Sequence, residues 1–184
     1  MGLGLAVARS EQAAVWIANA SAFPSGVEFA LELRWRPEMF EVVSRGAPWH
    51  YRPSEGGELP DELFRAGFQF PDGSKVTTLS SGLGLSAPTA VVESGANQEP
   101  EGPVLMARGG GGGAQSWSHG LWLWPLPQAE PLNFVCEWPA LGIVLTHTEI
   151  GLAPIHEAAG RSQVLWEDDR PPVPGFGPVP HPGS

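Results

Sequence analysis

Residues 27–36 carry the strongest structural signal, a strict alternation of apolar with mainly charged side chains. The apolar parity is continuous and consists of Val27, Phe29, Leu31, Leu33 and Trp35. The other parity holds two glutamates, two arginines and one alanine. Because successive side chains of a strand point to opposite faces, this pattern predicts a β-strand with one buried and one solvated face. Pro37 ends the strand.

Seven more segments have strand-like composition and are bounded by turn residues. They are residues 14–18, 65–70, 74–79, 104–108, 116–124, 132–138 and 143–147. Two of them flank Pro71-Asp72-Gly73, where a glycine after an aspartate supplies the positive φ of a tight hairpin. Residues 153–165 have the only clear helical spacing, and Pro154 suits a first helical position.

Eight short strands and a single C-terminal α-helix predict an all-β fold, an antiparallel β-sandwich. A partly open barrel is the alternative, and a βαβ fold is excluded because no helices separate the strands. Residues 13–166 are expected to form one domain. Residues 1–12 are small and aperiodic, which predicts a flexible N-terminus. Residues 167–184 contain six prolines and predict a disordered tail. The long polar loops are expected at 37–62, with a weak helical turn near 38–43, and at 80–103.

The charge balance and the single cysteine restrict the partner and the compartment. Acidic residues outnumber basic ones by 20 to 10, so the formal net charge is −10 and nucleic acid is excluded as the main partner. No apolar run approaches the roughly 20 residues of a membrane span. One cysteine and no export signal predict a cytoplasmic protein. Abundant glycine, proline and arginine with one lysine indicate a GC-rich, bacterial genome.

Several short motifs between residues 68 and 166 together resemble those of known sequences. A glycine run follows Arg108, Trp-Pro-Leu-Pro stands at 124–127, Phe-Val-Cys-Glu-Trp-Pro stands at 134–139, and a small-residue helix leads to Leu-Trp at 165–166. This combination resembles a group of uncharacterised bacterial proteins of unknown function. The resemblance extends weakly to residues 68–73 and covers about half of the chain. It implies a bacterial cytosolic origin and no particular chemistry.

Five consecutive glycines, at positions 109–113, form the first candidate site. A phosphate-binding loop requires a lysine and a following helix, and here a strand follows without a lysine. The run therefore predicts a flexible hairpin loop, which is also a candidate mobile flap beside a contact surface. Its candidate contact residues are Arg108, Gly110 and Gly112, with Trp117 on the far side.

Two tryptophans on one predicted strand form the second candidate site. Trp122 and Trp124 are two residues apart and share a face, so they could form a flat stacking platform for a sugar. Leu121 and Leu123 occupy the opposite face, which makes both faces apolar and favours a central strand with core tryptophans.

The remaining reactive side chains predict no catalytic or metal centre and no cofactor. His147 and His156 are nine residues apart on different elements, which meets no metal-ligand spacing. His50 and His119 are expected in loops or at edges. Cys136 shares its parity with two aromatic neighbours and is expected to be a buried, inert thiol. The acidic clusters near residues 55–62 and 167–169 are expected to be solvated surface.

The sequence is compatible with three functions. The first is a non-catalytic protein-interaction or scaffolding module whose partner is another protein. The second is a carbohydrate- or small-ligand-binding module that uses Trp117, Trp122 or Trp124. The third is a hydrolase of an unrecognised type. The fold class is compatible with all three.

Overall fold

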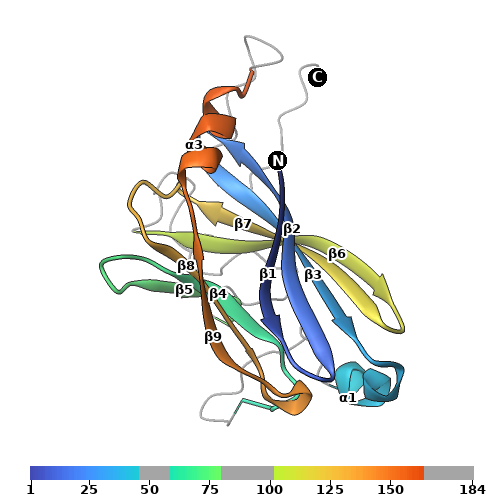
Figure 1. Cartoon of the computed structure of the whole chain (residues 1–184). Coiled ribbons are helices and arrows are strands. Elements are labelled where there is room, and N and C mark those ends of the chain that lie inside the picture. The colour runs from blue at the N-terminus through green and yellow to red at the C-terminus, as the bar shows by residue number, and fades with distance from the viewer. Residues whose placement is uncertain (46–58, 80–101, 164–184) are drawn as a thin grey trace, which may run out of the picture.

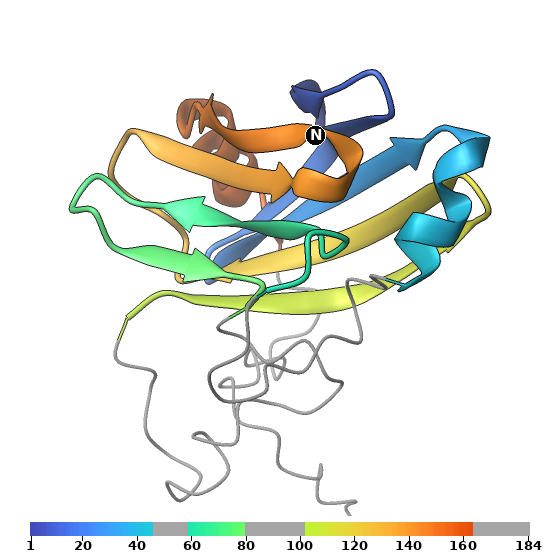
Figure 2. The ribbon, with the colours of Figure 1, turned by 90° about the horizontal axis from the view of Figure 1, so that it is seen from below.

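The computed structural model describes residues 1–45, 59–79 and 102–163, and these form two facing antiparallel sheets (Figures 1 and 2). Sheet A has five strands in the order β1 (Gly2–Arg9), β2 (Ala13–Phe23), β3 (Gly26–Trp35), β7 (Ser116–Trp124) and β6 (Val104–Gly113). Sheet B has four strands in the order β5 (Lys75–Thr77), β4 (Arg65–Gln69), β8 (Leu132–Trp138) and β9 (Ile143–Ile150). This is the predicted β-sandwich, and the sheets do not close into the alternative barrel.

The core lies between the sheets and follows the alternation of β3. Val27, Phe29 and Leu33 are fully buried, as their parity predicts. Phe29 contacts Phe68 of β4 with ring centroids 4.9 Å apart, and Phe68 contacts Phe134 of β8 at 5.4 Å. Edge-to-face and tilted aromatic pairs add to the stabilisation that burial itself provides. These rings therefore join the two sheets across the centre of the sandwich.

The N-terminal residues form strand β1, which corrects the expectation of a flexible segment over residues 1–12. β1 pairs with β2, and its Val7 side chain is buried in the core. Register shifts occur at two points of this pairing. Such irregularities break the period-2 pattern, and small residues supply little hydrophobic contrast, so the strand leaves no clear signal in the sequence.

Side-chain hydrogen bonds attach the β1 edge of sheet A to sheet B. Thr148 Oγ1 of β9 donates to the backbone oxygen of Val7 at 3.1 Å. Ser10 Oγ, just after β1, donates to the backbone oxygen of Leu141 at 2.6 Å. Within sheet A, the N-terminal amine of Met1 donates to the backbone oxygen of Ala20 of β2 at 2.7 Å. The two sheets are thus connected along the β1–β9 side.

The helices and the predicted hairpin confirm several local expectations. A 3-10 turn at Pro37–Met39 continues into α1 (Phe40–Arg45), where a weak helical turn is predicted. β4 and β5 form the hairpin around Gly73, whose φ is 85°. The C-terminal helix α3 (Ala153–Gly160) begins where predicted and is shorter than expected within the described residues. The proposed tail at 167–184 lies outside them.

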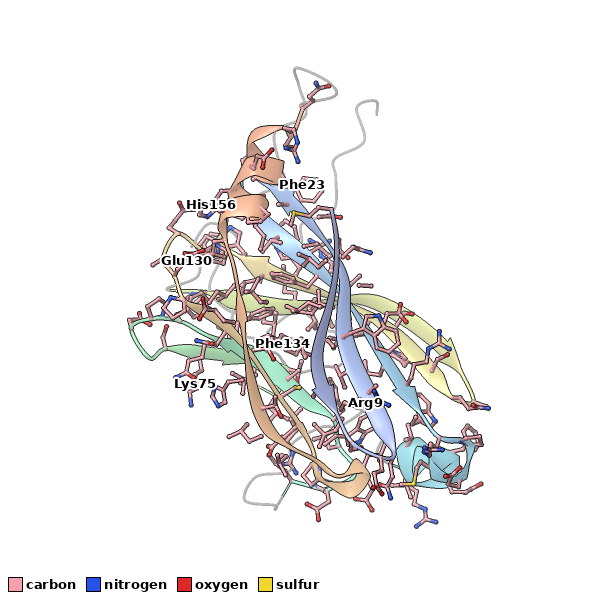
Figure 3. The ribbon with its side chains drawn as sticks, viewed as in Figure 1. Arg9, Phe23, Lys75, Glu130, Phe134 and His156 are labelled. Carbon is pink, nitrogen blue, oxygen red and sulfur yellow. The ribbon has the colours of Figure 1, made fainter. Side chains whose placement is uncertain are left out.

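Helix α3 packs on β2 and is fixed to the loop that precedes β8 (Figure 3). Its Ile155 side chain is fully buried. The Leu152 amide donates to Glu130 Oε1 at 2.6 Å, and His156 Nε2 lies 2.6 Å from the oxygen of Pro127. Figure 3 labels Phe23 at the end of β2, the strand on which the helix packs. The helix therefore covers the end of the sandwich at which β2 finishes.

Candidate functional site

All six candidate contact residues lie on one hairpin, formed by β6 and β7. They are Arg108, Gly110 and Gly112 on β6, and Trp117, Trp122 and Trp124 on β7. β7 is an inner strand between β3 and β6, as the two apolar faces of its sequence predict. Alternation along the strands divides the candidates between two faces of sheet A. Trp117 shares the core-facing parity of Leu121 and Leu123, while Trp122 and Trp124 lie on the opposite, outer face.

The glycine run belongs to strand β6, which corrects the expectation of a flexible loop and a mobile flap. Gly110 to Gly113 pair in register with His119 to Ser116 of β7, and the turn consists only of Ala114 and Gln115. Trp35 holds this turn in place. Its indole Nε1 donates to the oxygen of Ala114 at 2.8 Å, and its backbone amide donates to the oxygen of Gln115 at 3.2 Å.

The glycines have two different environments that alternate along β6. A Cβ at Gly110 would lie 2.7 Å from the oxygen of Ser118 and 2.8 Å from Nδ1 of His119. A Cβ at Gly112 would clash with the backbone oxygen of Ser116 and with Trp117. These two glycines therefore permit close approach of the neighbouring strand and its side chains. At Gly111 and Gly113 a Cβ would meet no atom within 4 Å.

Over Gly109–Gly113, the outer edge of β6 has no strand partner among the described residues. In residues 1–45, 59–79 and 102–163, β6 has β7 as its only strand partner. Gly113 and Ser116 flank a two-residue turn, and such a pair exchanges both backbone hydrogen bonds. Alternation along an antiparallel ladder then directs the amide and carbonyl groups of Gly110 and Gly112 away from β7. The edge thus presents backbone donors and acceptors on residues that carry no side chains of their own.

Trp122 and Arg108 form a contact on the outer face of sheet A. The Arg108 guanidinium carbon lies 5.2 Å from the centroid of the Trp122 ring. Phe23 adds a tilted ring at 5.9 Å and is 43% exposed. A cation over an indole face is attracted by the ring quadrupole. Gly120 is the register partner of Arg108 and leaves room for it, because a Cβ there would lie 3.0 Å from that of Arg108.

Trp122 and Trp124 are therefore half-buried residues of an outer face, which corrects the expectation that they are core. Their inner-face neighbours Leu121 and Leu123 are the buried ones. The sequence could not distinguish the two faces of β7 because both parities are apolar. Phe23 was missed as a member of this surface because it precedes a turn and carries no periodic signal.

Trp117 and His119 lie on the core-facing side of the hairpin, over the glycines. Trp117 is partly buried and packs against the core. His119 occupies the inner strand β7 rather than the expected loop or edge. Burial lowers the pKa of His119 below its ordinary value, because the charged imidazolium loses hydration there. The neutral form of this side chain is therefore favoured.

Cys136 and the other histidines give no catalytic arrangement in the described part of the chain. Cys136 is 2% exposed, as predicted, and burial together with the charge of Glu137 raises its pKa to about 12. A thiol of this kind is a poor nucleophile. His147 lies exposed on β9, and His156 Nε2 of α3 lies 2.6 Å from the backbone oxygen of Pro127. Across the described ranges, no three His, Cys, Asp or Glu side chains gather closely enough to hold a metal ion.

The candidate site is thus the β6–β7 hairpin, with an aromatic outer face and an open glycine edge. None of the helices in the described ranges is long and apolar enough to cross a bilayer. His50, two of the four acids near residues 55–62 (Glu55 and Glu58), and the Leu-Trp pair at 165–166 lie outside the described residues. Comparison with protein-family models, with curated proteins and with solved structures found no match to the chain, so the resemblance to bacterial proteins stays a prediction.

Proposed function

We propose that the chain is a non-catalytic protein-interaction module that receives an extended segment of a partner along β6. The open edge of this strand over Gly109–Gly113 carries the proposal. In strand addition, the main-chain hydrogen bonds of a sheet edge supply affinity for an extended peptide. The outward groups of Gly110 and Gly112 are the donors and acceptors that such a peptide would use.

The other sheet edges are less suited to this role. β1 is linked to sheet B through Val7 and Ser10. β5 spans only three residues, Lys75–Thr77. β9 lies beside β1, where its Thr148 Oγ1 donates to the backbone oxygen of Val7. Long, flat and exposed edges are the ones that recruit further strands, and β6 has the longest side-chain-free stretch.

A carbohydrate platform is the alternative, and the geometry of Trp122 favours it less. A sugar stacks on an uncovered ring face, whereas Arg108 lies over the ring of Trp122 and Phe23 adjoins it. A hydrolase would need an activated nucleophile, and the thiol of Cys136 is buried with a raised pKa. Protein interaction through β6 therefore remains the function that the described residues support best.

Site-specific photo-crosslinking tests the proposal. Gly113→Cys places a thiol where a side chain meets open space, and the buried Cys136 does not compete for a maleimide-linked benzophenone. The labelled full chain is irradiated in a lysate of the cells that make it. We expect a crosslinked polypeptide whose attachment site, mapped by mass spectrometry, is an extended segment.

The matched control is Val144→Cys on the edge of β9, labelled in the same way. This position is also exposed and also at a sheet edge. A crosslink from position 113 with none from position 144 supports the β6 edge as the contact. Equal crosslinking from both positions, or none from position 113, refutes it.

A further inference from the structure

We propose that the segment received by β6 is the β6 strand of a second copy of this chain, so that two copies pair edge to edge about a two-fold axis. This inference rests on the proposed function, since it uses the same open edge. Antiparallel pairing of a strand with itself is self-complementary, because each residue i facing j has its counterpart j facing i. Two five-stranded A sheets would then become one continuous sheet.

The outward backbone groups select the register of this pairing. Gly110 and Gly112 both direct their amide and carbonyl groups to the edge, and they lie symmetrically about Gly111. A two-fold axis at Gly111 therefore pairs Gly110 of each copy with Gly112 of the other through both backbone hydrogen bonds. The two Gly111 residues then face each other as a non-hydrogen-bonded pair, with Cα atoms about 4.5 Å apart.

A second copy suits this edge better than a foreign peptide. Specificity in strand addition comes from pockets for alternate side chains, and the glycine run forms none on β6. An identical strand needs no such pocket, because the paired glycines carry no side chains of their own. The matching shapes of two glycine strands thus supply the selectivity that a foreign sequence would have to obtain elsewhere.

Charge along β6 permits the pairing. Arg108 is the strand's one charged residue. Centred on Gly111, the register sets the two Arg108 residues about six strand positions apart, or roughly 20 Å along the sheet. That exceeds the Debye length of about 8 Å at physiological ionic strength, so their repulsion is screened. The net charge of −10 on each copy opposes association at low salt, and the dimer should therefore tighten as salt rises.

Charge substitution at Gly111 tests both the partner and the register. A side chain at this position enters open space in one copy and would stand directly opposite its equivalent in the pair. Sedimentation equilibrium of the full chain should give twice the 19.5 kDa mass. Gly111→Glu and Gly111→Lys should each weaken dimerisation by about tenfold or more, because like charges face each other. An equimolar mixture of the two variants should dimerise again.

Two further variants separate charge from bulk and from position. Gly111→Ala adds volume without charge and should still dimerise. Leu145→Glu introduces the same charge on the exposed edge of β9 and should leave the dimer unchanged. Circular dichroism and thermal melts show that each variant is folded before its mass is compared.

The outcomes distinguish this inference from the proposed function. A wild-type chain that sediments as a monomer overturns the second-copy pairing, and a crosslink from position 113 to a different protein would then leave the interaction module standing. A dimer that persists in both charged variants, or a mixture that stays monomeric, overturns the β6 register. Absence of any crosslink from position 113 together with a monomeric chain overturns both proposals.

Discussion

Sheet A has two edges of similar composition and opposite character, β1 and β6, at opposite margins of the sandwich (Figure 2). Both are rich in glycine and alanine. β1 is held by its own side chains, since Val7 is buried and Leu3 and Leu5 pack against the core. The second half of β6 has no side chains and is held through its neighbours, Trp35 and Trp117. An edge strand can thus be held by its own side chains, as β1 is, or by side chains of neighbouring strands, as β6 is. Only the second arrangement leaves the backbone of the edge open.

The largest difference between the edges should follow from deleting residues 1–9. The deletion removes the burial of Val7 and the packing of Leu3 and Leu5, together worth about 4 kcal/mol. For a domain of this size, we expect the melting temperature to fall by about 10 °C in differential scanning calorimetry. A truncated chain that melts with the full chain would mean that β1 is not docked. This expectation reverses the tolerance that a flexible N-terminus predicts.

Alanine substitutions at alternate glycines of β6 should have different effects on stability. Gly112→Ala forces a Cβ against Ser116 and Trp117 and should cost about 1–3 kcal/mol in urea unfolding. Gly113→Ala is the matched control, since its Cβ meets open space, and it should be neutral or stabilising by up to about 1 kcal/mol. Equal effects at the two positions would contradict the alternating environments. For this reason, Gly110 and Gly112 are poor sites for a binding test that requires an intact fold.

Removing the Ser10 hydroxyl, which links the end of β1 to sheet B, should destabilise the fold by a smaller amount. Ser10 Oγ donates to Leu141 and accepts hydrogen bonds from the amides of Gln12 and Ala13 at 3.1 and 3.0 Å. Ser10→Ala should therefore lower the free energy of unfolding by about 1–2 kcal/mol. Hydrogen exchange of β1 amides should accelerate in this variant while that of β3 amides does not. Unchanged exchange in β1 would show that the tether does not hold the edge.

The smallest expected effect is the pH dependence of stability that comes from His119, on β7 beside the β6 glycines. Burial lowers the pKa of His119 in the folded chain, so the unfolded chain binds a proton first as pH falls. The contribution of His119 to stability is full above about pH 6.5 and is lost below it, by at most about 1.4 kcal/mol per pH unit. His119→Gln should reduce this loss in urea unfolding between pH 7 and 5. His147→Gln, on the exposed face of β9, is the control for removing an imidazole, and an equal effect there would contradict the assignment.

Much of the fold was predictable from local sequence. Period-2 alternation located β3 and its buried face, because one parity is apolar and the other mainly charged. Asp72 and Gly73 located the β4–β5 hairpin through the backbone requirement of a tight turn. Cys136 was correctly expected to be buried, because its parity matches that of Phe134 and Trp138.

The candidate site was predictable only in part. The sequence singled out the six residues of the β6–β7 hairpin but not their arrangement on two faces. Both parities of β7 are apolar, so periodicity alone could not place Trp122 outside and Leu121 inside. Glycine has no side chain and a weak preference for strands, so the run at 109–113 resembled a loop.

The local sequence therefore determined which segments form alternating strands, where the tight turn lies, and that the Cys136 side chain is buried. These features depend on neighbours within a few residues. The tertiary structure decided that residues 2–9 are a strand, through hydrogen bonds from Thr148 and Ser10 that span more than 130 residues of sequence. It also decided that five glycines extend as a strand, because Trp35 fixes the turn from a strand about 80 positions away. Contacts at such separations depend on how the chain packs, and no local pattern encodes them.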